Sequence, residues 1–565
     1  MQGRDIYQPT RPRGDAFMWH HWRDLEARLS PLPARVAGFV RESHRNLVGI
    51  RGPTGSPVAL ANASTRAHVA ALVGANIHRA YDEEVIRSCS DSHSRIAGRI
   101  LSKEVREEFI KSCGIDPPEG RNTTDRGLLL RAGDPRWWRR QYRKCWTRGS
   151  ENAMRELGVV RKGRAPYASD EAVDHRAARK RSARAFLQSC VAVNEVGEQF
   201  ELWDLVQRSN ANPAIRRGEF MTRCRGFEEV AAFHGHCAEF VTVTTPSRFH
   251  AQLVAAGANP AHQRETVREA QGWLCTMWAR ARAKLKRLSV LMYGFRIAEP
   301  HHDGTPHWHL LLFVPEGVRD TLLCVLRGVF LSDGGDEPGA RERRVVCESI
   351  DSSKGSATGY VAKYVSKNID GAGAIGEASD DETGQRVADG VARVDAWASV
   401  HGIRQFQQVG GPAVLLWRES RRLRTAVDDV DIERARAAAD RGDWAGFIHA
   451  VGGIGCGRRT SLKLEKQETG ELNYYGEPRP AKVVGIRYAS AVELTRIHTW
   501  RIELCTGSGI SAPSRAALCG RAAGSNNGLS RVFSDLGPVS ITVRDQSDPS
   551  GWSNPMESSR WGPDG

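Results

Sequence analysis

The stretch from Glu299 to Val314 constrains the fold of this chain more than any other part of its sequence. It reads EPHHDGTPHWHLLLFV. His307 and His309 stand two residues apart and run into apolar residues, a pattern typical of a buried strand. Residues two apart on a strand project from one face, so both imidazoles should point one way and Trp308 the other. We therefore expect a rigid strand that presents two histidines together.

A short loop before this strand adds a carboxylate. Asp303–Gly304 is a turn signal, which predicts a hairpin whose first strand ends at Glu299. Glu299 then sits across from His307 and His309 and completes a metal site with open positions. Mixed nitrogen and oxygen ligands suit Mg²⁺ or Mn²⁺ when a phosphate oxygen fills the remaining sites, where the metal acts as a Lewis acid. The same ligand set describes non-haem iron oxygenases, and a histidine pair on a strand can be purely structural, so the motif alone leaves the chemistry open.

About fifty residues later, Gly359–Ile369 is predicted to be a helix that carries two tyrosines. Tyr360, Lys363 and Tyr364 fall on one stripe together with Lys367, while the apolar residues take the opposite side. Such tyrosines can be ordinary surface residues, but neighbouring lysines would lower a phenol pKa and neutralise charge on a phosphate. A tyrosinate that attacks a phosphodiester forms a phosphotyrosine and frees a hydroxyl, and two tyrosines permit two such steps.

Composition points to a polyanionic partner. The 565 residues include 81 Lys and Arg against 66 Asp and Glu, a formal net charge of +15. No apolar stretch approaches the roughly 18 residues that span a bilayer, and no apolar segment follows the charged start, so we expect neither a membrane partner nor a secretory signal. Twelve cysteines without a repeated spacing do not indicate a disulfide framework, which favours a reducing cytoplasm.

Strand-like and helix-like segments alternate in the middle of the chain, which predicts a sheet domain of the α/β or α+β class. We expect strands at 240–245, 291–299, 307–314 and 344–350, and helices at 262–288, 318–331 and 359–369.

Five regions are expected along the chain. They are a mainly helical basic N-terminal region (1–180), a helical segment (181–235), the sheet domain with the candidate site (236–425), a helical C-terminal region (426–505), and a Gly-, Ser- and Pro-rich tail expected to be disordered (506–565).

An aromatic segment within the N-terminal region allows two interpretations. Trp138, Tyr142 and Trp146 alternate with arginines and could stack on nucleic-acid bases. Their spacing of four residues also suits the buried face of a helix, which we favour.

Three motifs together resemble the HUH endonucleases, and most closely the replication gene A proteins of P2-like bacteriophages. In chain order they are FVTVTTPSRFH at 240–250, PHHDGTPHWH at 300–309 and YVAKYVSK at 360–367. The resemblance covers about 135–425. The tyrosines follow the histidines, as in replication initiators, whereas conjugative relaxases have the opposite order.

The resemblance implies an α+β catalytic domain, with a five-stranded antiparallel sheet flanked by helices, the histidines on a central strand and the tyrosine helix beside it. It also implies a site-specific single-strand nick at an origin, a 5′-phosphotyrosine link and a 3′-hydroxyl that primes rolling-circle synthesis, with a second tyrosine for termination and rejoining. The roles it implies are metal ligation by His307, His309 and Glu299, nucleophilic attack by Tyr360 and Tyr364, and phosphate contact by Lys363.

Two threonines of the first motif allow two interpretations. Thr242 and Thr244 share one strand face and could serve the framework or contact DNA.

The glycine-rich stretch 452–457 lacks the lysine of a phosphate-binding loop, so unwinding would fall to a host helicase. Expected partners are single-stranded DNA at the origin and the host replication machinery, in the cytoplasm of a bacterium that carries the phage or prophage. Alternatives are a catalytically inactive, prophage-encoded DNA-binding protein and a metal-dependent oxygenase.

Overall fold

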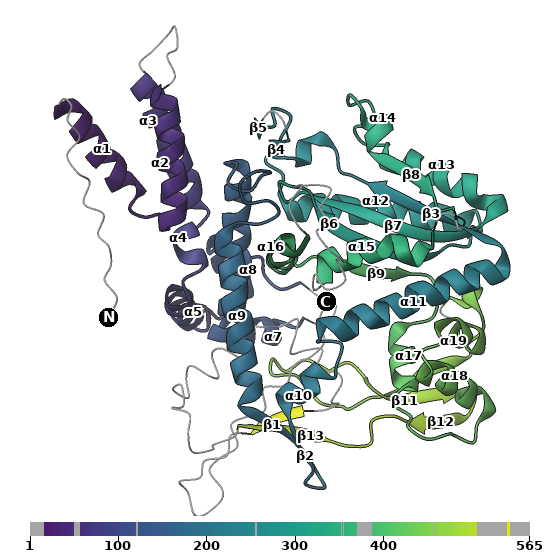
Figure 1. The fold of residues 1–565 in the computed structure, drawn as a ribbon. Helices are drawn as coiled ribbons and strands as arrows, with labels where there is room; N and C mark the ends of the chain where they lie inside the picture. Colours follow the sequence, from purple (N-terminus) through teal and green to yellow (C-terminus); the bar gives the residue numbers. More distant parts are fainter. Residues whose placement is uncertain are drawn as a thin grey trace, which may run out of the picture.

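Figure 1 shows a computed structural model of the chain, in which a group of helices stands beside a helix-flanked sheet. Residues 370–386 and most of the tail at 506–565 lie outside the residues that the structure describes. Those described are 16–49, 57–119, 123–254, 257–351, 353, 355–369, 387–457, 459–504 and 539–542.

The N-terminal region is mainly helical, as the sequence predicts. Its longest helix, α8, begins where the Asp134 side chain caps the first turn and Pro135 occupies the first helical position. Trp138, Tyr142 and Trp146 on α8 are buried and pack in a row, so their interpretation as the core face of a helix is confirmed. The helices here are α1 (Ala16–Leu29), α2 (Ala34–Gly49), α3 (Pro57–Gly74), α4 (Ile77–Ala80), α5 (Glu83–Ala97), α6 (Lys103–Ser112), α7 (Asp125–Ala132), α8 (Pro135–Glu156) and α9 (Asp170–Gln188).

A five-stranded antiparallel sheet forms the centre of the molecule, which confirms the α+β class. The strand order is β8-β3-β7-β6-β9, so β7, which carries the histidines, is the central strand. Strands β6 and β7 are the two arms of the predicted hairpin. The strands are β3 (His236–Val243), β6 (Tyr293–Pro300), β7 (Pro306–Pro315), β8 (Val345–Ser349) and β9 (Phe406–Val409).

Helices cover both faces of this sheet, which is why β6 and β7 are buried along almost their whole length. Trp308 and Leu310 face the core shared with α12 and α13, whereas Leu311 and Phe313 face the core shared with α11 and α15. The histidines of β7 are therefore on the α11 and α15 side. The helices of this domain are α11 (Pro213–His234), α12 (Val267–Arg287), α13 (Arg319–Phe330), α14 (Ala340–Arg343), α15 (Ala357–Ile369) and α16 (Val387–His401), with short strands β4 (Gln252–Leu253) and β5 (Gly257–Ala258).

Local chemistry sets two details of the domain. Helix α12 begins at Val267 and not at His262, because Thr266 and Glu269 form a reciprocal capping box. Strand β6 requires glycine at position 294, where φ is +145° and a Cβ would lie 2.0 Å from the Leu311 carbonyl oxygen. That close approach keeps β6 paired tightly with β7.

The segment 181–235, expected to be helical, contains two strands, and the expectation is wrong there. The β-branched run at Val191 and Val193 is short and is followed by a turn at Gly197, which favours a strand over a helix. The elements are β1 (Cys190–Asn194), β2 (Gln199–Glu201) and α10 (Leu202–Gln207), before α11.

The expectation of a helical region at 426–505 holds only as far as Ala450. Beyond it, the apolar residues alternate with period two over short segments, a signal that the overall charged composition conceals. From residue 414 to residue 504 the helices and strands are α17 (Val414–Ser420), α18 (Val430–Asp440), α19 (Trp444–Ala450), β10 (Leu462–Gln467), β11 (Lys482–Tyr488), β12 (Ala491–Leu494) and β13 (Trp500–Leu504).

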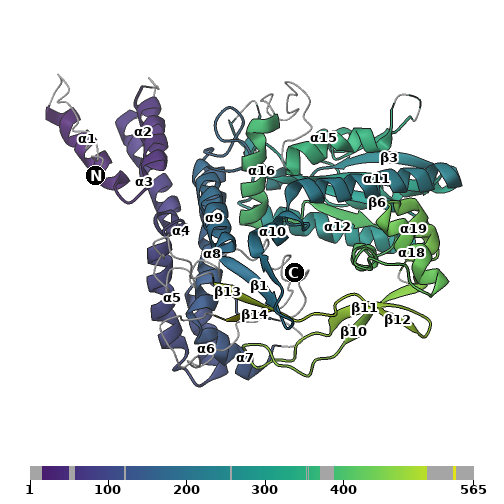
Figure 2. The same cartoon turned by 60° about the horizontal axis from the view of Figure 1, so that its bottom comes forward.

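The N- and C-terminal regions meet below the central sheet (Figure 2). Strand β13 pairs with β1, and the otherwise undescribed tail contributes β14 (Val539–Thr542), parallel to β13. Arg131 of α7 binds both carboxylate oxygens of Glu477, each at 2.6 Å, and the Tyr475 hydroxyl donates to Asp134 at 2.9 Å. No helix among the described residues has the length and apolar character needed to cross a bilayer.

Candidate metal centre and tyrosine helix

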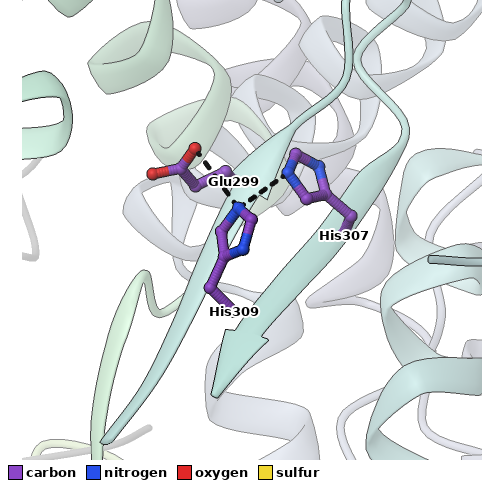
Figure 3. Close-up of side chains that lie close together, drawn as sticks. All are labelled: Glu299, His307 and His309. Carbon is purple, nitrogen blue, oxygen red and sulfur yellow. Dashed lines mark hydrogen bonds and ion pairs between the residues drawn. The ribbon is translucent and has the colours of Figure 1, made fainter. Parts of the chain in front are cut away.

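The hairpin brings three potential metal ligands together. Glu299 pairs directly with His307 in the β6–β7 register, and His309 follows on the same face of β7. The Nε2 atoms of His307 and His309 are 3.1 Å apart, and His309 Nε2 lies 3.8 Å from Glu299 Oε2. All three side chains are buried, and Figure 3 shows His309 between the other two.

This spacing suits one divalent cation. Two ligand atoms at about 2.1 Å from an ion, at right angles to each other, lie about 3 Å apart. The ligand atoms of His307, His309 and Glu299 all fall within 4.8 Å of one another. Two imidazoles and one carboxylate leave positions for water or phosphate oxygen, which suits Mg²⁺ or Mn²⁺. The hairpin thus brings Glu299 to the histidine pair.

Neighbouring side chains fix the orientation of both imidazoles. The ring of His301 stacks on that of His307 with centroids 4.1 Å apart, and Phe240 stacks on His309 at 5.3 Å. Thr242 Oγ1 lies 3.0 Å from His309 Nδ1. With a cation on Nε2, Nδ1 would keep its proton and donate a hydrogen bond to this hydroxyl, which would favour the tautomer needed for ligation. Thr242 thus contacts a candidate metal ligand directly.

The turn between the two strands is built around a buried aspartate. Asp303 accepts hydrogen bonds from the backbone N–H groups of Ala251 at 2.9 Å and Thr305 at 3.0 Å. Burial by itself raises the pKa of this carboxyl, but hydrogen bonding with His250 and the charge of Arg155 hold the pKa well below its usual value. The turn signal of the sequence thus also provides a fixed negative charge.

Arg155 of α8, in the N-terminal region, neutralises that charge. Its Nε lies 3.9 Å from Asp303 Oδ2, and its guanidinium donates to Thr305 Oγ1 at 3.0 Å and to the carbonyl oxygens of Glu265 and Phe249. The side chain is almost fully buried. Sequence reasoning missed Arg155, because an isolated arginine 150 residues before Thr305 carries no local signal.

Replacing Arg155 with alanine is expected to lower the free energy of unfolding by about 3–5 kcal/mol, because it leaves the Asp303 carboxylate buried without its cation. Urea denaturation followed by fluorescence measures the loss. Arg161→Ala, an exposed position a few residues further on, serves as the control and should change stability by no more than about 0.5 kcal/mol. Adding Asp303→Asn to Arg155→Ala should recover part of the lost stability. A double variant less stable than Arg155→Ala alone would contradict the pairing of Arg155 with Asp303.

The tyrosine helix α15 lies against the same face of the sheet as the histidines. Its first turn is capped by Glu228 of α11, which accepts hydrogen bonds from the Ala357 N–H at 2.7 Å and the Thr358 hydroxyl at 2.7 Å. Val361 and Val365 are buried in the core, as the sequence predicts. The side chain of Lys363, expected to contact phosphate, lies outside the described part of the structure.

Both tyrosines of α15 lie close to the metal-ligand cluster. The Tyr364 ring is centred 4.4 Å from the His309 ring, and the Tyr360 ring is 4.6 Å from Phe240. The Tyr360 hydroxyl donates to Glu348 of β8 at 2.5 Å, and 40% of the Tyr360 surface is exposed. The two tyrosine rings are 6.3 Å apart. One phenol of α15 therefore packs on a candidate metal ligand, and the other lies beside the phenylalanine that stacks on the same ligand.

An α+β protein with this sheet, ligand cluster and tyrosine helix can be compared with known proteins. The family model described as bacteriophage replication gene A protein matches residues 104–372, which include every candidate site residue. Residues 104–372 of the chain are therefore similar to the replication gene A proteins of bacteriophages.

Individual relatives show the same similarity. The replication gene A protein of Escherichia phage P2 is 36% identical over 430 residues, which cover 71% of this chain and 56% of the relative. The replication protein of Haemophilus phage HP1 is 38% identical over 385 residues, 66% of this chain and 48% of the relative. A probable replication endonuclease from a prophage-like region of Salmonella typhi is 37% identical over 366 residues, 61% of this chain and 45% of the relative.

The chain spans about half the length of these curated relatives. No solved structure matches it.

Proposed function

We propose that the protein is a site-specific endonuclease that nicks one DNA strand at a phage replication origin and so initiates rolling-circle replication. The observation that carries the proposal is the contact between Tyr364 and His309, which brings a phenol beside the cluster of potential metal ligands. The names of the relatives, replication gene A protein and replication endonuclease, support the same activity.

In the proposed reaction the phenolic oxygen of Tyr360 or Tyr364 attacks the scissile phosphorus. The new oxygen–phosphorus bond forms as the bond from phosphorus to the 3′ oxygen breaks, which leaves a 5′-phosphotyrosine and a free 3′-hydroxyl. A divalent cation bound by His307, His309 and Glu299 would supply Lewis-acid polarisation of that phosphate. The second tyrosine would serve a later cleavage and rejoining, because the phosphotyrosine conserves the energy of the original bond.

The proposed partners are single-stranded DNA and proteins of the bacterial host. The substrate would be single-stranded DNA at the origin, and the net charge of +15 would favour its approach. Strand separation would come from a host helicase, and the 3′-hydroxyl would pass to the host replication machinery in the bacterial cytoplasm. An oxygenase would use the same ligands, but it gives no role to the two tyrosines beside them.

The deciding experiment looks for the covalent intermediate. The protein is incubated with Mn²⁺ and labelled single-stranded oligonucleotides that tile the genome of the phage or prophage encoding it. We expect a denaturation-resistant protein–DNA adduct on one oligonucleotide, with peptide mapping placing the nucleotide on Tyr360 or Tyr364. No adduct on any oligonucleotide, or an adduct on another residue, would overturn the proposal.

A further inference from the structure

Glu348, which no sequence motif includes, lies at the tyrosine pair. It is on β8, an edge strand of the sheet, and its Oε2 accepts the hydrogen bond from the Tyr360 hydroxyl at 2.5 Å. A hydrogen bond to a carboxylate is a strong one, and here the donor is the group expected to attack phosphorus.

The sheet positions this carboxylate on the face that carries the metal ligands. In the β3–β8 register Glu348 stands opposite Phe240, and the Phe240 ring contacts Tyr360, Tyr364 and His309. Neighbours on one face of adjacent strands lie about 5 Å apart, so Glu348 lies next to Phe240, whose ring stacks on His309.

The end of β8 is held in place. Arg319 donates to the Ser349 hydroxyl at 2.5 Å and to Glu239 of β3 at 2.5 Å. Ser349 also donates to Glu239 at 2.8 Å. These bonds tie β8 to β3 beside Glu348, so the carboxylate has a fixed starting position although the side chain is exposed.

We propose that Glu348 is a catalytic residue that accepts the phenolic proton of Tyr360 as Tyr360 attacks DNA. The inference rests on the proposed function and goes beyond it, because it assigns a proton acceptor to one of the two tyrosines. The proton moves from Tyr360 Oη to Glu348 Oε2 while Oη bonds to phosphorus. The 3′ oxygen leaves and takes a proton from solvent water, and Glu348 then releases its proton to solvent.

The chemistry requires such an acceptor. A phenol with an ordinary pKa of about 10 is almost entirely protonated at neutral pH, and its neutral oxygen is a weak nucleophile. A carboxylate already bonded to the hydroxyl removes the proton as the new bond forms, an effect typically of about 10²–10⁴-fold. In rejoining, Glu348 would first take up a proton from solvent and then pass it to the departing tyrosine oxygen.

The test isolates each tyrosine in turn. In a Tyr364→Phe background, single-turnover adduct formation with saturating Mn²⁺ and oligonucleotide reports on Tyr360 alone. Adding Glu348→Gln should slow that reaction by about 10²–10⁴-fold, because an amide oxygen can accept the hydrogen bond but cannot hold the proton. Oligonucleotide affinity, measured by anisotropy, should change by less than about threefold, and Glu348→Asp should recover part of the rate.

The comparison background is Tyr360→Phe, in which any adduct forms through Tyr364. There Glu348→Gln should change the rate of adduct formation by less than about tenfold, because the Tyr360 hydroxyl that donates to Glu348 is already absent. Asp320→Asn, an exposed carboxylate on the opposite side of the sheet, is the control in both backgrounds and should have no effect.

Three results would overturn the role of Glu348. They are an unchanged Tyr360 rate in the Glu348→Gln variant, an equal loss for both tyrosines, or no Tyr360 adduct while Glu348 is intact. In each case an adduct formed through Tyr364 would leave the proposed endonuclease function standing. The absence of any adduct in the unchanged protein would instead reject that function.

Discussion

Replacing both Tyr360 and Tyr364 with phenylalanine is expected to abolish the covalent DNA adduct and to lower nicking by at least about 10³-fold. Phenylalanine keeps the ring that packs on Phe240 and His309 but lacks the oxygen that would bond to phosphorus. Removal of one tyrosine should leave the adduct that the other forms. Denaturing electrophoresis of labelled oligonucleotide measures both adduct and nick.

A tyrosine elsewhere in the chain provides the matched control. Tyr474 is 45% exposed, close to the 40% of Tyr360, and packs against Arg136 far from the ligand cluster in sequence. Tyr474→Phe should leave the adduct yield unchanged. Adduct formation by the double Tyr360→Phe/Tyr364→Phe variant would show that neither phenol is the nucleophile.

His307→Ala is expected to lower the nicking rate by at least about 10³-fold and to weaken Mn²⁺ binding, while single-stranded DNA affinity stays within about threefold. The substitution removes the imidazole that lies 3.1 Å from His309 and pairs with Glu299 across the hairpin. DNA affinity depends mainly on many phosphate contacts, whereas the cation acts on one phosphate during reaction. Calorimetric titration measures the affinity for Mn²⁺ and does not depend on nicking activity.

The chain offers a control with the same histidine spacing. His234 and His236 are also two residues apart, but His234 is exposed at the end of α11 and belongs to no cluster of three potential ligands among the described residues. His234→Ala should preserve both Mn²⁺ affinity and nicking. Equal Mn²⁺ affinities for His307→Ala and the unchanged protein would remove His307 from the metal site.

The central sheet and the arrangement of candidate residues followed from local patterns in the sequence. Period-two spacing predicted the strand with His307 and His309, and the turn signal at Asp303–Gly304 predicted the hairpin. Helical spacing predicted the core face of α15. These signals lie within a few residues of one another, so no long-range contact was needed to find them. The chemical roles of the tyrosines, Lys363 and the metal ligands stay predictions.

Features that depend on distant contacts could not be predicted. The β1–β13 pairing joins Cys190 to Leu504, and Arg155 reaches Thr305 across 150 residues. Nothing near these positions in the sequence indicates their partners. The strands after Ala450 were missed for a different reason, since they are short and half-exposed and their alternation is weak beside a charged composition.

The burial of Arg155 against the hairpin turn also bears on how such a gene could exchange parts with its relatives. A recombination that transferred only the segment from the first motif to the tyrosines would carry Asp303 without Arg155, so the carboxylate would be neutralised only where the recipient's α8 has an arginine at the matching position. The unit that can be inherited intact therefore begins at least as early as α8, well before the first recognisable motif. The motifs mark where the proposed chemistry resides, while the smallest exchangeable module is set by a guanidinium from outside them.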